Sequence, residues 1–324
     1  MRVLPVLANG TIAPRIDRRY LNPSGQWVIE CGDIGNVFAS PVQTDPTLPP
    51  VLASDWNAMY WCRSADVTEP FVIAARTVVD GAGSLTGEAR LFATRTGGAP
   101  LPDSYWTLRF NPEHVVSARE PGDKLREVAG PSKLSVAATP QGYAVSFLHR
   151  SRLQFGWLDR DLHVVGALTQ LPTLGATPGR ATMRWNGSEL VMVFADRAVS
   201  SDRYALRAAR VAYGQAPQAS SFFPLASSPE MTEHEFAPEL TRLDDGTLLL
   251  TWTQGAENAR SGVQNIFARR YATDLSPRGG PLFVLGSASD SEVIAVNGNR
   301  AVLVALSGTS GVRAVQALAL HCDP

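Results

Sequence analysis

The chain alternates short apolar runs with tight polar turns, and the clearest example lies between residues 238 and 252. An apolar-rich run at residues 238–243 is followed by Asp244, Asp245 and Gly246 and then by a second run at residues 247–252. Asp-Gly between two such runs is typical of a β-hairpin, because both residues tolerate the positive φ that tight turns require. The pattern predicts two antiparallel strands joined by a short turn.

The same order of run, turn and run recurs along the chain, which indicates a repeat protein. Three further copies are clear and three are weaker. The clear copies pair residues 181–185 with 189–194, 292–296 with 301–306, and 133–137 with 143–148; the weaker ones pair 51–54 with 58–62, 106–110 with 114–118, and 15–20 with 27–31.

A third apolar run of similar composition follows several of these hairpins, and a fourth is present after at least one. The third runs are residues 72–76, 206–210, 266–270 and 312–318, and the fourth is residues 282–285. About four strands in a repeat of roughly 40–50 residues is the blade of a β-propeller. No segment shows sustained helical periodicity with caps, so the predicted fold is all-β.

The spacing of the repeats predicts one propeller domain covering residues 1–324, with seven blades. The units start near residues 15, 51, 106, 133, 181, 239 and 292. The interval from 106 to 133 is too short for four strands. Either that blade is reduced to about three strands, or the hairpin at residue 106 is an insertion and the ring has six blades.

The last repeat ends with its third strand, and we expect residues 2–7 to supply the missing outer strand and close the ring. Pro5 is compatible with an edge strand, where its absent N–H need not join the ladder.

Charge and hydropathy exclude some classes of partner. The net charge is -1 and charged residues make up 18% of the chain, so there is no basic surplus for nucleic acid or acidic membranes. No run approaches the roughly 18 apolar residues of a membrane-spanning helix. The first seven residues are too short an apolar stretch for a signal peptide. We therefore predict no nucleic-acid partner and no transmembrane segment.

The cysteines carry no recognisable chemistry. Cys31, Cys62 and Cys322 are odd in number and show no CxxC or His-spaced pattern. We expect them to be free, and we predict neither a metal site nor a cofactor.

The candidate ligand-binding residues lie where first strands begin. Residues 230–235 form the densest polar cluster, and the same loop position recurs in other repeats. Carboxylates beside a histidine can bind a cation or act as acid and base on a glycosidic bond. The alternative is a solvated loop that is polar because it meets water. The candidates are Lys133, Arg180, Glu233, His234, Glu235, Glu239, Asp290 and Glu292.

Residues 243–281 resemble the repeat of secreted bacterial β-propeller-repeat proteins and repeats in exported proteins of high-GC soil bacteria. The residues that carry the resemblance are Asp-Asp-Gly-Thr-Leu-Leu-Leu-Thr-Trp, Ile-Phe-Ala-Arg-Arg-Tyr and Asp-Leu-Ser-Pro-Arg-Gly-Gly-Pro. The resemblance implies an extracellular, cell-surface or periplasmic protein. The spacings of WD40 and kelch repeats and the Ser-x-Asp-x-Gly-x-x-Trp box of sialidases are missing.

The repeats are clear, whereas no set of catalytic residues is recognisable. The sequence therefore favours a non-catalytic binding or scaffolding propeller. Such a protein would present a loop face to a protein or glycan partner. The alternative is a propeller hydrolase that acts on carbohydrate through Glu233, Glu235, Glu239, Asp290 or Glu292.

Overall fold

The computed structural model describes part of the chain, and its described residues are built almost entirely of β-strands. They are residues 19–21, 27–29, 58–62, 71–81, 85–95, 103–109, 132–175, 178–201, 203–225, 233–256, 263–296, 299–308 and 314–321. Within these ranges the helical element is a single 3-10 turn, Ala219–Ser221.

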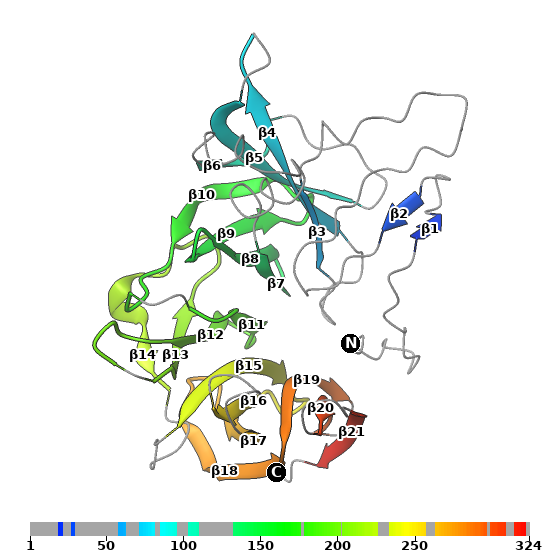
Figure 1. Ribbon diagram of the computed structural model, residues 1–324, viewed down its shortest axis with the longest axis vertical. Helices are drawn as coiled ribbons and strands as arrows, with labels where there is room; N and C mark the ends of the chain where they lie inside the picture. The colour runs from blue at the N-terminus through cyan, green and yellow to red at the C-terminus, as the bar shows by residue number, and fades with distance from the viewer. Residues whose placement is uncertain are drawn as a thin grey trace. The chain divides into compact units, whose positions relative to one another are not determined.

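The strands form antiparallel sheets in which neighbours along the chain are neighbours in the sheet (Figure 1). Four sheets have four strands each. The first consists of β3 (Ala58–Cys62), β4 (Phe71–Val79), β5 (Leu85–Arg95) and β6 (Trp106–Arg109), and the next of β7 (Ser132–Ala138), β8 (Gly142–His149), β9 (Arg152–Asp159) and β10 (Val164–Gln170). The third consists of β11 (Thr182–Trp185), β12 (Leu190–Asp196), β13 (Ala205–Val211) and β14 (Phe223–Pro224), and the fourth of β15 (His234–Arg242), β16 (Leu248–Gly255), β17 (Gln264–Tyr271) and β18 (Pro277–Leu285). The sheet of β19 (Ala288–Val296), β20 (Arg300–Ser307) and β21 (Ala314–His321) has three strands, and β1 (Arg19–Leu21) pairs with β2 (Trp27–Ile29). Meandering four-stranded sheets are the blades of a propeller, so the predicted all-β propeller class is confirmed.

The described strands fall into two compact units, which divide between Gln170 and Leu171. The first contains the sheets up to β10, and the second contains the sheets from β11 to β21. The first has a core in which Leu91 and Trp106 pack with Val145, Phe147 and Leu158. The second carries most of the candidate site residues.

Turn chemistry explains the hairpins of the second unit. Gly246 has φ +83° and Gly187 has φ +116°, conformations that favour glycine. In the first of these turns the amide of Gly246 donates to the carbonyl oxygen of Leu243 at 3.0 Å, and the amide of Leu243 donates to the carbonyl oxygen of Thr247 at 2.8 Å. The hairpins predicted around both glycines are confirmed.

The assignment of Trp106 to the start of a blade is wrong. β6 pairs with β5, with Leu91 opposite Trp106, and is the outer strand of the sheet that begins at β3. Residues 58–62, expected as a second strand, are the edge strand β3 of that described sheet. An apolar run shows where a strand is, but its partner is decided by packing.

The first strands of four successive sheets carry the same irregularity. In each, three steps along the first strand match two steps along the second, which is the signature of a β-bulge. In β7, Ser132 lies opposite Leu148 and Ser135 lies opposite Ser146. In β15, Phe236 lies opposite Thr253 and Glu239 lies opposite Thr251. In β19, Ser289 lies opposite Leu306 and Glu292 lies opposite Val304. Ahead of β11, the amide of Gly179 donates to Ala195, whereas Thr182 lies opposite Val193.

The bulge gives each blade a corresponding pair of residues that lie opposite a single residue of the second strand. They are Lys133 and Leu134, Arg180 and Ala181, Ala237 and Pro238, and Asp290 and Ser291. A bulge lets the chain accept Pro238 inside a strand, because the bulged residue need not donate to the ladder. Ala237 has φ +48°, so the backbone there is in the left-handed region.

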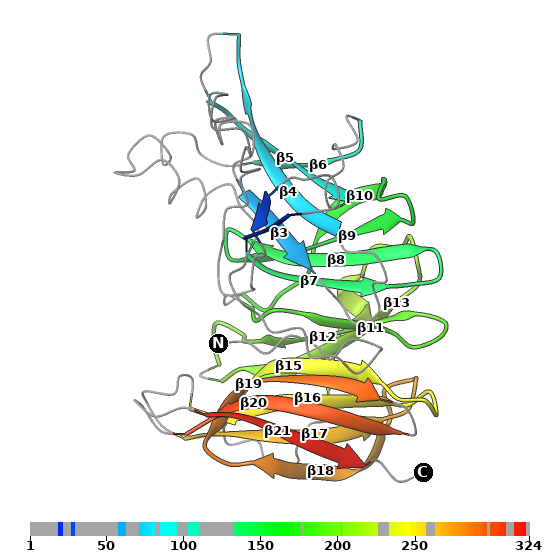
Figure 2. The same ribbon diagram turned by 90° about the vertical axis from the view of Figure 1, so that its right-hand side faces the viewer.

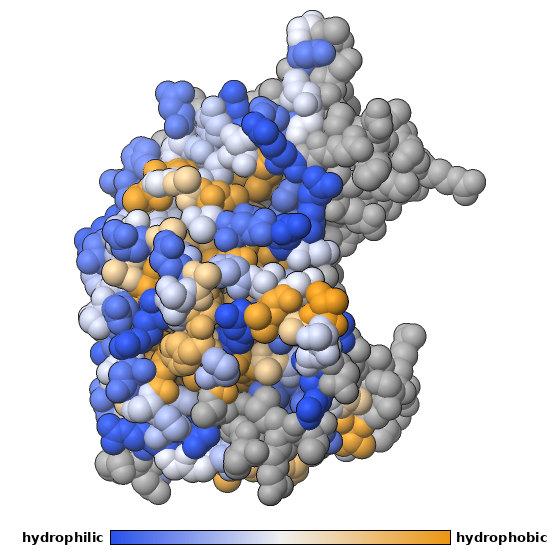
Figure 3. All heavy atoms as spheres, turned by 90° about the vertical axis from the view of Figure 1, so that its left-hand side faces the viewer, coloured by the Kyte–Doolittle hydropathy of each residue, from blue (hydrophilic) through white to orange (hydrophobic). Residues whose placement is uncertain are grey.

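The β15–β18 sheet lies between its neighbouring sheets in the second unit (Figures 1 and 2), and apolar side chains make the contacts on both of its faces. On one face of the β15–β18 sheet, Leu250 and Trp252 belong to a cluster with Val191 and Val193 of the preceding sheet. On the other face, Leu249 clusters with Val293 of the following sheet. Large apolar side chains are also exposed on the described residues, and polar and apolar atoms lie interspersed on the face in Figure 3.

Candidate functional site

The candidate residues lie at the first strands of four sheets: Lys133 in β7, Arg180 just ahead of β11, Glu233, His234, Glu235 and Glu239 at or in β15, and Asp290 and Glu292 in β19. Glu233 is exposed ahead of β15, His234 begins it, and Glu235 follows. Glu239 comes directly after the bulge, opposite Thr251. The bulge therefore separates Glu239 from the polar cluster of residues 230–235.

The structure brings two of the predicted residues, Arg180 and Glu239, into an ion pair. Arg180 is the first bulge residue of its blade, and its Nη2 contacts Oε1 of Glu239. The two side chains are 21% and 17% exposed, so the pair is partly desolvated but within reach of solvent. One residue after Glu239, the amide of Leu240 donates a hydrogen bond to Oγ1 of Thr182 at 3.0 Å, and this bond fixes β15 against the preceding blade.

His234 belongs to a stack of aromatic and cationic groups. Its Nδ1 accepts a hydrogen bond from the amide of Tyr204 at 3.3 Å, so the neutral ring carries its proton on Nε2. The centroids of the His234 and Tyr204 rings are 6.0 Å apart, and the guanidinium carbon of Arg197 lies 4.6 Å from the Tyr204 centroid. Sequence reasoning missed Tyr204 and Arg197, because both lie outside the repeated hairpin pattern.

Glu235 is closed off from solvent, with 0% of its surface exposed. Its Oε2 accepts a hydrogen bond from the amide of Leu206 at 3.4 Å, and its own amide donates to the carbonyl oxygen of Tyr204 at 3.0 Å. Burial raises the pKa of the nearby Tyr271 phenol; the charge of Arg269 opposes this effect and that of Glu235 adds to it. Glu235 therefore ties two blades together and does not face a ligand in this conformation.

The remaining predicted residues are placed by their backbone alone. Lys133 and Asp290 are each the first of the two bulge residues of their strand, as Arg180 is in its own blade. Glu292 is the first residue after the bulge in β19, as Glu239 is in β15. The side chains of Lys133, Asp290 and Glu292 lie outside the described part of the structure. Lys133 also belongs to the other compact unit.

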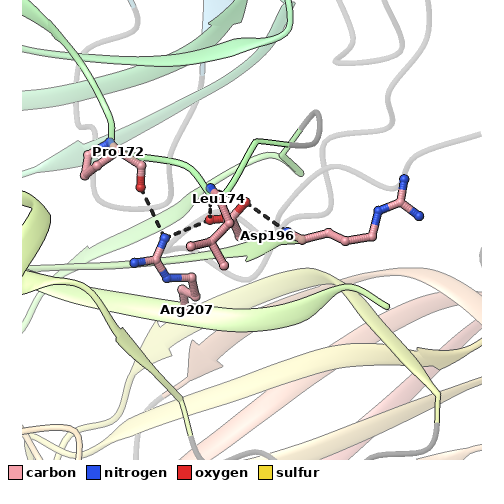
Figure 4. A network of polar contacts seen from close by, with 5 residues as sticks. Pro172, Leu174, Asp196 and Arg207 are labelled. Carbon is pink, nitrogen blue, oxygen red and sulfur yellow. Dashed lines mark hydrogen bonds and ion pairs between the residues drawn. The ribbon is translucent and has the colours of Figure 1, made fainter. Parts of the chain in front are cut away.

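A second buried ion pair was not anticipated from the sequence (Figure 4). Asp196, at the end of β12, accepts hydrogen bonds from the amides of Leu174 and Arg197 and from Nη1 of Arg207, the last at 2.8 Å. Arg207 also donates to the carbonyl oxygen of Pro172 at 3.2 Å. The Asp196 side chain has no exposed surface, so this pair links strand to loop rather than meeting a ligand.

Among the described residues, no three His, Cys, Asp or Glu side chains gather closely enough to hold a metal ion. None of the helical structure in those ranges is long and apolar enough to cross a membrane.

No protein-family model matches the chain, and no curated protein matches it significantly. Solved structures that resemble it include an α-L-arabinanase of Penicillium chrysogenum complexed with arabinobiose, with a TM-score of 0.45 and 12% identity, covering 84% of this chain and 82% of that one. An endo-arabinase from Bacteroides thetaiotaomicron has a TM-score of 0.42 and 11% identity, covering 82% and 94%. The α-L-arabinofuranosidase Arb93A of Fusarium graminearum has a TM-score of 0.43 and 9% identity, covering 82% and 93%.

These structures are glycoside hydrolases, and this finding contradicts the prediction of a non-catalytic binding or scaffolding propeller that is not an enzyme. That interpretation is set aside, and a protein partner has no support. At these TM-scores the likeness concerns strand arrangement and identifies no active residue in this chain, so the residues themselves must carry any assignment.

Proposed function

We propose that the chain is a carbohydrate-active hydrolase whose carboxylates lie on the first strands of successive blades. The observation that carries the proposal is the register of Glu239 and Glu292. Each follows the bulge of its first strand by the same number of steps, and β15 and β19 pack against each other. Most glycoside hydrolases use two carboxyl groups flanking the scissile bond.

The ion pair with Arg180 separates the roles of the two carboxyl groups. An adjacent guanidinium favours the charged form of a carboxylate. Glu239, which contacts Arg180, is therefore assigned the part of nucleophile or base. Glu292 is assigned the part of general acid, which must hold a proton for the leaving oxygen.

The stack of Arg197, Tyr204 and His234 lies at the start of β15 and supplies groups suited to a sugar. Aromatic rings offer an apolar face, and the His234 ring carries a donor on Nε2. We assign this stack to substrate binding. The partner in this proposal is a carbohydrate.

We also propose that the protein acts outside the cytoplasm as one propeller domain. The support is the resemblance of residues 243–281 to repeats of secreted bacterial propeller proteins. Fractionation of the source cells, with detection of the chain in the medium or periplasm, tests this part separately from the activity.

The activity is tested with the purified chain on a panel of arabinans, fructosides and aryl glycosides, measured as release of reducing sugar. Glu239→Gln and Glu292→Gln should each lower kcat by about 10²–10⁴-fold, the range for loss of one acid–base group. Glu189→Gln is the matched control, because Glu189 pairs with Arg210 at 3.6 Å beside the turn that joins β11 to β12. Turnover unchanged in Glu239→Gln, or no hydrolysis of any substrate, would overturn the proposal.

A further inference from the structure

Three buried hydroxyl groups lie in the seam between the β15–β18 sheet and the β19–β21 sheet. Thr251 and Thr253 of β16 are 0% exposed, and Ser291 of β19 is 3% exposed. The hydroxyl oxygens of all three have no hydrogen-bond partner within the described part of the chain. A hydroxyl that is removed from water without a partner costs free energy, so a cluster of three in one seam requires an explanation.

The register places the two threonines on the face of their sheet that meets β19. Side chains opposite each other in a sheet share a face, and Thr251 lies opposite Ala268 while Thr253 lies opposite Ile266. Ala268 belongs to a cluster with Val293 of β19, and Ile266 belongs to a cluster with Ala288 of the same strand. Both hydroxyls therefore project into this seam.

Ser291 approaches the same seam from the other side. It is the second bulge residue of β19 and lies between Ala288 and Val293, which are both buried on the seam face. Ser291 is two residues before Val293, so strand alternation puts its side chain on the same face, toward the strand that carries Thr251 and Thr253. The bulge explains why Ala288, five residues before Val293, lies on that face as well.

We propose that the seam contains an internal water site whose hydrogen-bonding groups are the hydroxyls of Thr251, Thr253 and Ser291. Buried waters typically make about three hydrogen bonds to buried polar groups that otherwise lack partners. The surrounding groups, Ile266 and Ala288 among them, are apolar. A bound ion would need charged or numerous oxygen ligands, and the carboxylate of Glu239 opposite Thr251 is already paired with Arg180.

Whether the melting temperature falls or rises when one of these hydroxyls is removed tests this site. Valine has the shape of threonine without its hydroxyl, so Thr253→Val and Thr251→Val remove a hydrogen bond if the hydroxyl binds water. Each variant should lower the melting temperature by roughly 2–4 °C. Thr182→Val is the matched control, because its hydroxyl has a known protein partner, the amide of Leu240 at 3.0 Å, and it should also lower the melting temperature. A higher melting temperature in both seam variants would show that the hydroxyls are dry and would overturn the site.

A crystal structure of the full chain at high resolution gives an independent readout. It should show an ordered water about 2.7–3.0 Å from at least two of the three hydroxyl oxygens. A dry seam would refute the proposal. So would a melting temperature that rises when sodium replaces a large organic cation at constant ionic strength, since that result would assign the site to a metal ion.

Discussion

The second strands of four sheets each bury a polar side chain near their end. In each sheet this residue directly follows the residue of the second strand that pairs with the first strand just before the bulge. These residues are His149, Asp196, Gln254 and Ser307, all less than a tenth exposed. A sequence pattern marks a polar residue at the end of a strand as solvated. Tertiary contacts decide otherwise: His149 contacts the carbonyl oxygen of Arg109, and Asp196 accepts a hydrogen bond from the amide of Leu174.

His149 shows the consequence of such burial. Its Nε2 donates to the carbonyl oxygen of Arg109 at 3.1 Å, and its buried Nδ1 has no partner. Burial lowers the pKa of His149 from its ordinary value; the Arg109 hydrogen bond opposes this effect, and the charge of Arg150 adds to it. Folding therefore disfavours the protonated imidazole, whose Nδ1 has no acceptor among the described residues.

The free energy of unfolding should fall as the pH drops below about 6.5, the pKa of an unperturbed histidine. In that range the unfolded chain binds a proton at His149 that the folded chain does not, so stability rises with pH. The loss should level off below the folded pKa. Urea unfolding from pH 5 to 8 measures it, and His149→Gln should flatten this part of the profile.

His163→Gln is the control for that experiment, because His163 is exposed and pairs with Asp159 at 3.2 Å. The pH-dependent difference should survive in this variant. If the difference between the parent and His149→Gln is the same at every pH, the buried neutral imidazole does not govern acid sensitivity.

At the scale of elements, the hairpins could be predicted because their turns are encoded locally. Gly246 lies in the turn that the Asp-Gly pair indicated, and Gly187 lies in the turn expected between the runs 181–185 and 189–194. The bulges could not be predicted in this way. A bulge is a mismatch between two strands, and only Pro238 gives a local sign of one inside a strand. For the same reason the sequence grouped Glu235 with Glu239, although the bulge puts a buried residue before the gap and a partly exposed one after it.

Breaking the Asp196–Arg207 pair (Figure 4) by removing one member should cost far more stability than breaking an exposed pair of the same charges. Removal of one member of a buried pair leaves the other charged and desolvated, which costs about 3–5 kcal/mol. Asp196→Ala should lower the free energy of unfolding by that amount, since the Arg207 side chain is only 13% exposed. Glu189→Ala, which breaks the exposed pair with Arg210, should cost less than about 1 kcal/mol.

Chemical unfolding of both single variants, and of Asp196→Ala combined with Arg207→Ala, measures the difference. The double variant should be more stable than the sum of the two single losses predicts, because it leaves no orphaned charge. Equal losses for the buried and the exposed pair would mean that the network in Figure 4 contributes no more than a surface contact.

At the scale of the whole molecule, the sequence determines the fold class more fully than it determines the activity. Repeated hairpins with similar third strands, such as residues 206–210 and 266–270, are enough to specify blades. The order in which strands share sheets depends on long-range packing, which is why Trp106 was assigned to the wrong blade. The two carboxyl groups proposed for catalysis, those of Glu239 and Glu292, come from different blades, and their spacing along the chain follows no motif.

The sheet of β19, β20 and β21 has three described strands, one fewer than each of the other two sheets of its unit. Within the described residues, β21 pairs with β20 alone, and its Val315 is 41% exposed. Residues 2–7 have the apolar composition of a strand but lie outside the described residues, so their pairing with β21 stays a prediction. An unpaired edge strand is a template for association with other chains.

Deletion of residues 1–9 should therefore lower the free energy of unfolding by several kcal/mol and promote aggregation, because the edge of β21 would lose its partner. Removal of Asp323 and Pro324, which follow β21, is the matched control and should change neither property. Chemical unfolding and light scattering measure the two effects. A truncated chain that is as stable as the parent and stays monomeric would show that residues 1–9 contribute no strand, and that β21 remains an edge or is covered by another partner.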